Sequence, residues 1–249
     1  MYKRQTDAPT SALSVIYSEE GEHICEMVYD RSPDIVLVDT SIIVKAPVRL
    51  LTAGMGDALA TYFEARACIE SDSSSNMDGY RATVTSYAIA RECYRVLLAD
   101  AKKALLAARN GVSTKAFQNI VEVNTLLSGV GAESNGASGA HAFHDGFTVL
   151  KETESYYHGE KVAFGVLCQL ILENAPDDEI EEVIGFLKQT GLPMTLEDIG
   201  ICDVSEEKIR KVAEAVMKSP LIPKEPFEVT EDMIYSAIVA ADALGRSEK

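Results

Sequence analysis

Residues 139–146 read Gly-Ala-His-Ala-Phe-His-Asp-Gly, and residues 158–163 read His-Gly-Glu-Lys-Val-Ala. The chain contains four histidines, and three of them fall within this window, at positions 141, 144 and 158. Upstream, residues 54–64 read Gly-Met-Gly-Asp-Ala-Leu-Ala-Thr-Tyr-Phe-Glu, which joins a carboxylate to an apolar helical pattern. Imidazole and carboxylate groups are common metal ligands, so the three stretches together predict helices arranged around a metal site.

Asp57, His141 and His158 are the candidate metal ligands. A catalytic zinc usually keeps three protein ligands and leaves one position for water or substrate, and these residues supply one carboxylate and two imidazoles. We expect Asp57 to begin a helix after a Gly-Met-Gly turn, His141 to lie on a short helix, and His158 to begin the next helix. His144 lies about one helical turn after His141, which makes it a fourth candidate or a group that contacts the substrate. Spacing alone is equally compatible with packed histidines and a helix-terminal aspartate, so both interpretations stay open.

The apolar pattern divides the chain near Pro47. From that residue onward the spacing of apolar residues is helical, which predicts a mainly α multi-helix domain over residues 47–249. Before it, we expect a β-hairpin made of residues 11–17 and 22–29, with residues 18–21 as its turn.

Residues 34–39 contain the apolar run Ile-Val-Leu-Val, which predicts a strand buried on both faces. Such a strand needs other strands and helices around it, and residues 1–46 supply too few of them to complete a sheet. We therefore expect residues 1–46 to be the remnant of an incomplete N-terminal α/β nucleotide-binding domain. The helices expected after it lie at 57–71, 81–108, 113–129, around 141, 159–174, 177–190, from 205, and 230–244.

The bulk composition is that of a globular protein that does not bind polyanions. The chain has 249 residues, of which 47% are hydrophobic and 25% charged, and its formal net charge is −16. This charge argues against nucleic acid and anionic membranes as partners, because both require clustered Lys and Arg. No apolar run is long enough to span a bilayer, and the first residues lack a signal-peptide pattern. The five cysteines form no CxxC pair, so we expect reduced, buried thiols in a cytoplasmic protein.

The motifs resemble those of the glycerol dehydrogenase family, within the iron-containing alcohol dehydrogenase superfamily. Residues 6–17, Thr-Asp-Ala-Pro-Thr-Ser-Ala-Leu-Ser-Val-Ile-Tyr, resemble the family's segment that lines the nicotinamide and substrate pocket. Residues 54–66 resemble its first metal-ligand helix, and residues 139–144 and 158–165 resemble its two other ligand segments. The likeness runs from Thr6 to the end of the chain.

The resemblance implies a zinc ion held by Asp57, His141 and His158. Iron-using relatives carry a further histidine four residues after the aspartate, and this chain has Thr61 there, which fits the three-ligand zinc pattern. One carboxylate with two histidines also suits iron. As part of the metal centre, His141 is expected to border the substrate as well.

The resemblance also implies an NAD-dependent oxidation of glycerol to dihydroxyacetone. Asp7 would then contact the polyol and orient a hydroxyl group, and His144 would relay a proton. The nicotinamide end of NAD would contact Ser11, Leu13 and Tyr17. Members of the family form larger assemblies, so a homo-oligomer is expected for the intact protein.

One large departure from the family concerns the phosphate loop. Family members begin with an α/β domain whose glycine-rich loop binds the dinucleotide pyrophosphate, and no GxGxxG or GGG pattern follows a strand here. We therefore expect an N-terminally truncated chain that binds metal weakly or not at all and does not turn over. Residues 1–5 are expected to be non-native, because residues 2–5 match a translated sequencing-library adaptor.

Other functions are compatible with parts of the pattern. A dehydroquinate-synthase-like lyase would need basic residues around a phosphate-like group, and the site stretches offer little beyond Lys161. A free-standing helical metal-binding module would not explain the strands before Pro47. A dehydrogenase for another small diol or alcohol fits as well as one for glycerol. Four charged residues of the site stretches are expected to be ordinary surface charges: Glu64, Arg66, Glu160 and Lys161.

Overall fold

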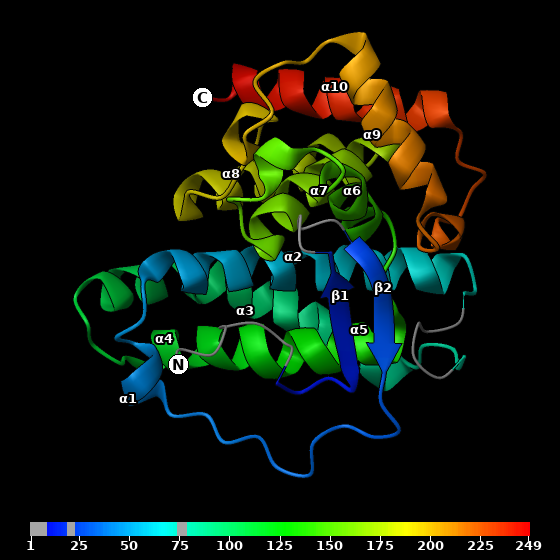
Figure 1. The fold of residues 1–249 in the computed structure, drawn as a ribbon. Coiled ribbons are helices and arrows are strands. Elements are labelled where there is room, and N and C mark those ends of the chain that lie inside the picture. The colour runs from blue at the N-terminus through cyan, green and yellow to red at the C-terminus, as the bar shows by residue number, and fades with distance from the viewer. Residues whose placement is uncertain (1–8, 19–22, 74–78) are drawn as a thin grey trace.

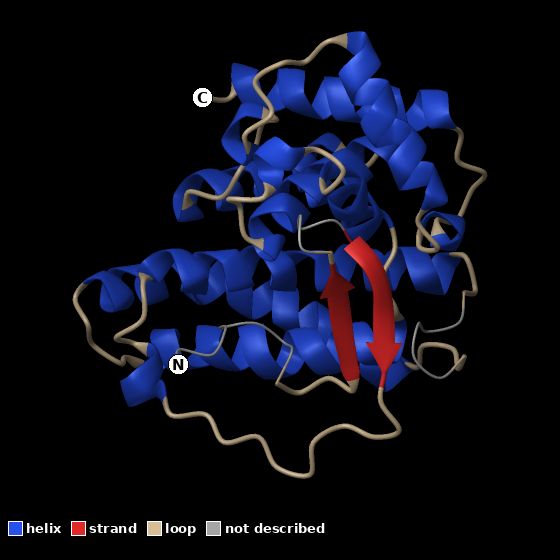
Figure 2. Ribbon diagram, viewed as in Figure 1, coloured by secondary structure: helices blue, strands red, loops and turns tan. Residues whose placement is uncertain are grey.

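The computed structural model describes residues 9–18, 23–73 and 79–249. Helices make up most of this part of the chain, and its two strands form one hairpin (Figure 2). The strands are β1 (Leu13–Tyr17) and β2 (His23–Val28). The helices are α1 (Thr40–Ile43), α2 (Val48–Glu70), α3 (Val84–Arg109), α4 (Lys115–Glu122), α5 (Ser128–Asn135), α6 (Gly139–Phe147), α7 (His158–Leu172), α8 (Asp177–Thr190), α9 (Glu206–Lys218) and α10 (Glu231–Ser247).

The hairpin predicted near the N-terminus is confirmed. Strands β1 and β2 are antiparallel, with Leu13 opposite Val28 and Ile16 opposite Cys25. The backbone ladder continues beyond the strands, where the amide of Tyr29 donates to the carbonyl of Ala12. The turn predicted at 18–21 lies mostly outside the described residues.

The strand predicted at residues 34–39 is wrong. This segment is an irregular connection that follows the edge of the molecule between β2 and α1 (Figure 1). Ile35 is 84% exposed and Leu37 is 92% exposed, so the apolar run is not buried on either face. In the described part of the chain, β1 pairs with β2, and no third strand joins them to form a sheet around this run. A strand gains its backbone hydrogen bonds and its burial from neighbouring elements, and apolar composition cannot replace them.

Helix α2 lies across the middle of the molecule, packed against α3 on one side and α7 on the other (Figure 1). It begins at Val48, directly after Pro47, so Asp57 lies in its interior and not at its start, as the sequence had suggested. Gly56 is part of the helix, not of a turn. A Cβ atom at that position would overlap the backbone carbonyl oxygen of Gly159 in α7. This glycine is therefore required by the close approach of two helix backbones.

The helices predicted after α2 are present, with shifted ends. Helix α3 begins after a capping box in which Thr83 and Ser86 bond each other's backbone amides. The helix predicted to end near residue 129 instead continues to Asn135 through a π-helical turn, Val123–Leu127, that joins α4 to α5. The side-chain amide of Asn124, in that turn, donates to the backbone carbonyl of Leu51 in α2.

Helix α7 is the centre of the second half of the fold. Nearly all of its residues are buried, since α6, α10 and α2 pack around it and α8 contacts it as well. An apolar helix that is covered on several sides belongs to the core of a domain. Helices α9 and α10 pack together and complete this half (Figure 1).

Two general predictions concern membrane-spanning helices and the cysteines. Among the described residues, no helix combines the length and the apolar character that a membrane crossing needs. The cysteines at 68, 93 and 168 are buried as expected, whereas Cys25 and Cys202 are exposed. The prediction of buried thiols is therefore confirmed for three of the five cysteines and wrong for the other two.

Candidate metal centre

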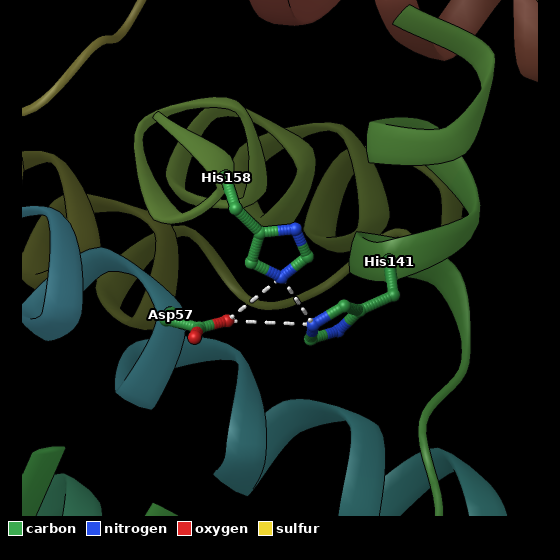
Figure 3. A group of neighbouring side chains, drawn as sticks. All are labelled: Asp57, His141 and His158. Carbon is green, nitrogen blue, oxygen red and sulfur yellow. Dashed lines mark hydrogen bonds and ion pairs between the residues drawn. The ribbon is translucent and has the colours of Figure 1, made fainter. Parts of the chain in front are cut away.

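Three helices bring Asp57, His141 and His158 to one point (Figure 3). Asp57 comes from the interior of α2, His141 from the first turn of α6, and His158 is the first residue of α7. Asp57 is far from the two histidines in the sequence, and the three residues meet because α7 packs against both α2 and α6. The sequence-based grouping of these residues therefore corresponds to a cluster in space.

The donor atoms form a nearly equilateral triangle. The Nε2 atoms of His141 and His158 are 3.3 Å apart. Oδ1 of Asp57 lies 3.4 Å from the first of these nitrogens and 3.2 Å from the second. Tetrahedral zinc with bonds of about 2.0–2.2 Å to N and O places neighbouring ligand atoms about 3.3–3.6 Å apart. The donor set and its spacing fit a small divalent cation with three protein ligands.

Burial differs across the triangle. The side chain of Asp57 is 6% exposed, whereas those of His141 and His158 are 21% and 29% exposed. The carboxylate thus closes one side of the cluster, and the two imidazole rings form its accessible side. The two histidines are therefore the part of the cluster that solvent reaches.

The ring of His141 is held from behind by Glu64. Its Nδ1 atom lies 2.7 Å from Oε2 of Glu64, a residue of α2 that is 1% exposed. Predicting Glu64 as a surface charge was therefore wrong. The sequence did carry a signal, because Glu64 follows Asp57 by two helical turns and so lies on the same face of α2.

The ring of His158 is held by a different group. Its Nδ1 atom lies 3.0 Å from Nε2 of His144, which is 1% exposed. The contacts continue from Nδ1 of His144 to Oδ1 of Asp145, at 3.2 Å, and from Ser219 Oγ to Oδ2 of Asp145, at 2.9 Å. His144 therefore stands behind His158, outside the triangle of donor atoms.

The charges at the site compensate one another. Burial raises the pKa of Asp57, but the two histidines outweigh this effect and hold the pKa of the carboxyl well below its usual range. Burial lowers the pKa of His141, but Glu64 and Asp57 outweigh this effect and hold the pKa of the ring well above its usual range. The buried carboxylates thus require positive charge at the triangle, which a proton or a metal ion can supply.

The start of α7 is anchored to the start of α2. Glu160 accepts two hydrogen bonds from Arg49, at 2.6 and 2.7 Å, and a third from the amide of Tyr157, at 2.8 Å. Glu160 and Lys161 are 8% and 5% exposed, so predicting them as a surface pair was wrong. The contacts of Glu160 hold the first turn of α7, and with it His158, against α2.

The residues predicted to contact substrate and cofactor lie in the N-terminal segment. Ser11 precedes β1, and Leu13 and Tyr17 are the first and last residues of that strand. Asp7 lies outside the described residues. The neighbouring Thr10 is attached to the helices, since its hydroxyl donates to the carbonyl of Thr125 at 2.5 Å.

The chain is similar to glycerol dehydrogenases along almost its whole length. It is 53% identical over 242 residues to a glycerol dehydrogenase of Citrobacter freundii, covering 97% of this chain and 66% of that protein. The crystal structure of a probable glycerol dehydrogenase from Sinorhizobium meliloti matches with a TM-score of 0.94 at 49% identity, covering 98% of this chain and 68% of that one. The chain therefore spans about two thirds of the length of these relatives.

More distant solved structures share the fold. An iron-containing alcohol dehydrogenase from Thermococcus thioreducens matches with a TM-score of 0.73 at 16% identity, over 96% of this chain and 63% of that one. At this identity the likeness concerns the arrangement of the helices alone. No protein-family model matches the chain.

Proposed function

The chain belongs to the glycerol dehydrogenase family, and from this membership we propose that it carries the metal-binding part of an oxidoreductase. The proposed reaction oxidises glycerol to dihydroxyacetone and transfers a hydride to NAD. The observation that supports it is the triangle of donor atoms, in which Asp57, His141 and His158 meet at 3.2–3.4 Å. A dehydrogenase of this kind needs a site that can activate a substrate hydroxyl group.

Asp57, His141 and His158 are the proposed ligands of a zinc ion. When bound, the ion would act as a Lewis acid that lowers the pKa of the substrate hydroxyl. Thr61 supports a set of three ligands, because its buried hydroxyl contacts Ser128 Oγ at 3.3 Å and is thus engaged outside the triangle.

The chain's own residues would divide the remaining tasks. The partly exposed rings of His141 and His158 border the space in which the substrate hydroxyl would lie. His144 is the proposed proton relay, since it contacts His158 on one side and Asp145 on the other. Asp7 is proposed to orient a second hydroxyl of the polyol.

The cofactor is proposed to lie against the N-terminal segment, where Ser11, Leu13 and Tyr17 would contact the nicotinamide. We further propose that residues 1–46 belong to an α/β nucleotide-binding unit and that residues 47–249 form the metal-binding unit. The exposed apolar side chains at 35–38 support this division, because an α/β unit would bury them. A homo-oligomer is proposed, and light scattering of the purified protein would measure it.

The test compares the chain with a longer fusion protein. The fusion places the N-terminal third of the Citrobacter freundii relative in front of residue 6. With glycerol, NAD and Zn²⁺, we expect the fusion to produce NADH and the chain alone to produce none. Chelation should abolish the activity of the fusion, and added Zn²⁺ should restore it.

The matched control for the fusion is Asp57→Asn, which keeps the side-chain shape and removes the anionic ligand. We expect it to abolish turnover of the fusion. Normal turnover by the chain alone, or by the Asp57→Asn fusion, would contradict the proposal. A panel of small diols and alcohols offered to the active fusion would test the preference for glycerol.

A further inference from the structure

Glu64 contacts the start of α6 with both of its carboxylate oxygens. Oε1 accepts the backbone amides of Ser138 and His141, at 3.0 and 2.9 Å. Oε2 lies 2.7 Å from Nδ1 of His141. A single buried side chain therefore binds both the backbone and the ring of one candidate ligand.

These contacts determine where the proton of a neutral His141 ring resides. Backbone amides only donate, so Oε1 must accept from both of them. An ionised carboxylate can only accept at Oε2 as well, so Nδ1 must carry the hydrogen. The lone pair of His141 then resides on Nε2, because Oδ1 of Asp57, 3.4 Å from that atom, competes for the ring proton less strongly than Oε2 of Glu64 does at 2.7 Å from Nδ1. Nε2 is also the atom that faces His158.

We propose that Glu64 is a positioning residue of the metal centre, which keeps His141 in the tautomer whose Nε2 lone pair points at the ion. This inference rests on the proposed metal site. A carboxylate behind a ligand histidine commonly serves this purpose, because it orients the ring and makes the ligating nitrogen more basic.

The other histidine shows the contrast. His158 is backed by the imidazole of His144, whose Nε2 can either donate or accept a hydrogen bond. Asp145, 3.2 Å from Nδ1 of His144, would make that Nε2 an acceptor, so the tautomer of His158 is set through two groups. Of the two candidate histidine ligands, His141 is the one whose Nδ1 contacts a carboxylate directly, through Glu64.

Glu64→Gln is the informative variant because it preserves shape and reverses one hydrogen bond. The amide oxygen of the new side chain must face the two backbone amides, since its NH₂ group there would leave two donors unsatisfied. The NH₂ group then faces Nδ1 of His141 and donates to it. The ring proton is displaced to Nε2, where it occupies the position of the metal.

Glu225→Gln is the matched control. Glu225 is 4% exposed, and its Oε1 accepts the amide of Gly139, at the same end of α6. The control replaces Glu by Gln beside the same helix terminus, and Glu225 makes no hydrogen bond to the ring of His141 in the described part of the chain.

The experiment measures Co²⁺ affinity by absorption in competition with a chelator, and the His141 tautomer by ¹⁵N NMR. The NMR spectra are recorded with Zn²⁺ bound and, for metal-free protein, at an alkaline pH where the ring is neutral. For Glu64→Gln we expect about 10–100-fold weaker Co²⁺ binding and, in the metal-free protein, a proton moved from Nδ1 to Nε2. Glu225→Gln should bind Co²⁺ like the unmodified chain.

Each outcome has one meaning. Co²⁺ binding by Glu64→Gln at the affinity of the unmodified chain, or a proton that stays on Nδ1, would overturn the inference. Equal losses in both variants would overturn it as well, because they would show a general effect of the α6 terminus. The chain alone is expected to bind metal weakly or not at all, so the proposed metal site would be contradicted only if the unmodified fusion also bound no Co²⁺. The metal-free NMR spectra would decide the role of Glu64 in either case.

Discussion

The helical body, residues 47–249, and the N-terminal segment, residues 1–46, differ in how far they bury an apolar side chain. Leu59, in α2, is fully buried, whereas Leu37, in the connection between β2 and α1, is 92% exposed. Both lie in apolar stretches that predict regular structure. The body buries its stretch because α3 and α7 cover α2 on opposite sides, and no described element covers residues 35–38 in this way. Burial is therefore a property of the partners of a segment as much as of its composition.

Charged residues show the same contrast. Glu64 and Glu225 in the body are buried, and each accepts backbone amides of the α6 terminus. Asp39, at the end of the exposed connection, caps the short helix α1 through the amide of Ser41, at 2.9 Å. A carboxylate in the body thus supports a distant element, and one in the segment supports only its neighbours in sequence.

The largest expected difference comes from one substitution made in both regions. Leu59→Ala should lower the free energy of unfolding by about 2–5 kcal/mol, because it removes buried methyl groups and leaves a cavity. Leu37→Ala should change it by no more than about 0.5 kcal/mol, because its side chain is already exposed to water. Urea unfolding followed by circular dichroism measures both values. Equal losses in the two variants would mean that residues 35–38 are covered in solution.

A smaller effect is expected where two ligand helices touch. In Gly159→Ala, the new Cβ would overlap the backbone carbonyl of Ala53 in α2, so the helices must separate. We expect a loss of about 1–3 kcal/mol, the usual cost of overpacking a core. The control is Gly185→Ala in α8, where a Cβ meets no atom within 4 Å. It should raise stability by about 0.5–1 kcal/mol, and a destabilised control would contradict the packing argument.

A gradual effect, spread over several pH units, is expected from Glu225. Burial and the nearby carboxylates of Glu173 and Glu64 raise its pKa from the ordinary 4.5 to about 8. Between these two values the folded chain binds more protons than the unfolded chain, so this group's contribution to stability falls as the pH rises from 4.5 to about 8. One proton contributes a slope of at most about 1.4 kcal/mol per pH unit.

Urea midpoints at several pH values across this window would measure the slope, and Glu225→Gln should reduce it. Asp39→Asn is the comparison from the N-terminal segment. The pKa of Asp39 is lowered by Ser41, and its titration therefore lies below this window. An unchanged slope in Glu225→Gln would show that other groups cause the pH dependence.

Much of the candidate site could be predicted from residue types and spacing. Three histidines in one window and an aspartate before an apolar helical run named the candidates but left two interpretations open, and the family resemblance favoured the metal site. The structure brings Asp57, His141 and His158 together. Glu64 was missed because its distance of two helical turns from Asp57 defines a shared face, but not what lies opposite that face. Glu160 and Lys161 were missed for a related reason, since a charge at a helix start is usually exposed and here α2 covers it.

The sequence by itself determined the helices, the hairpin and the candidate ligands, because periodicity, turn residues and metal-ligand chemistry are local properties. Tertiary structure decided where α2 begins and which carboxylates are buried. It also decided which glycines allow two helices to pack closely and which do not, and that residues 34–39 form no strand. Each of these depends on contacts between residues that are distant in sequence, such as Gly56 with Gly159 and Glu64 with His141. The pattern of one segment does not contain its partner, and the partner determines burial, hydrogen bonding and charge.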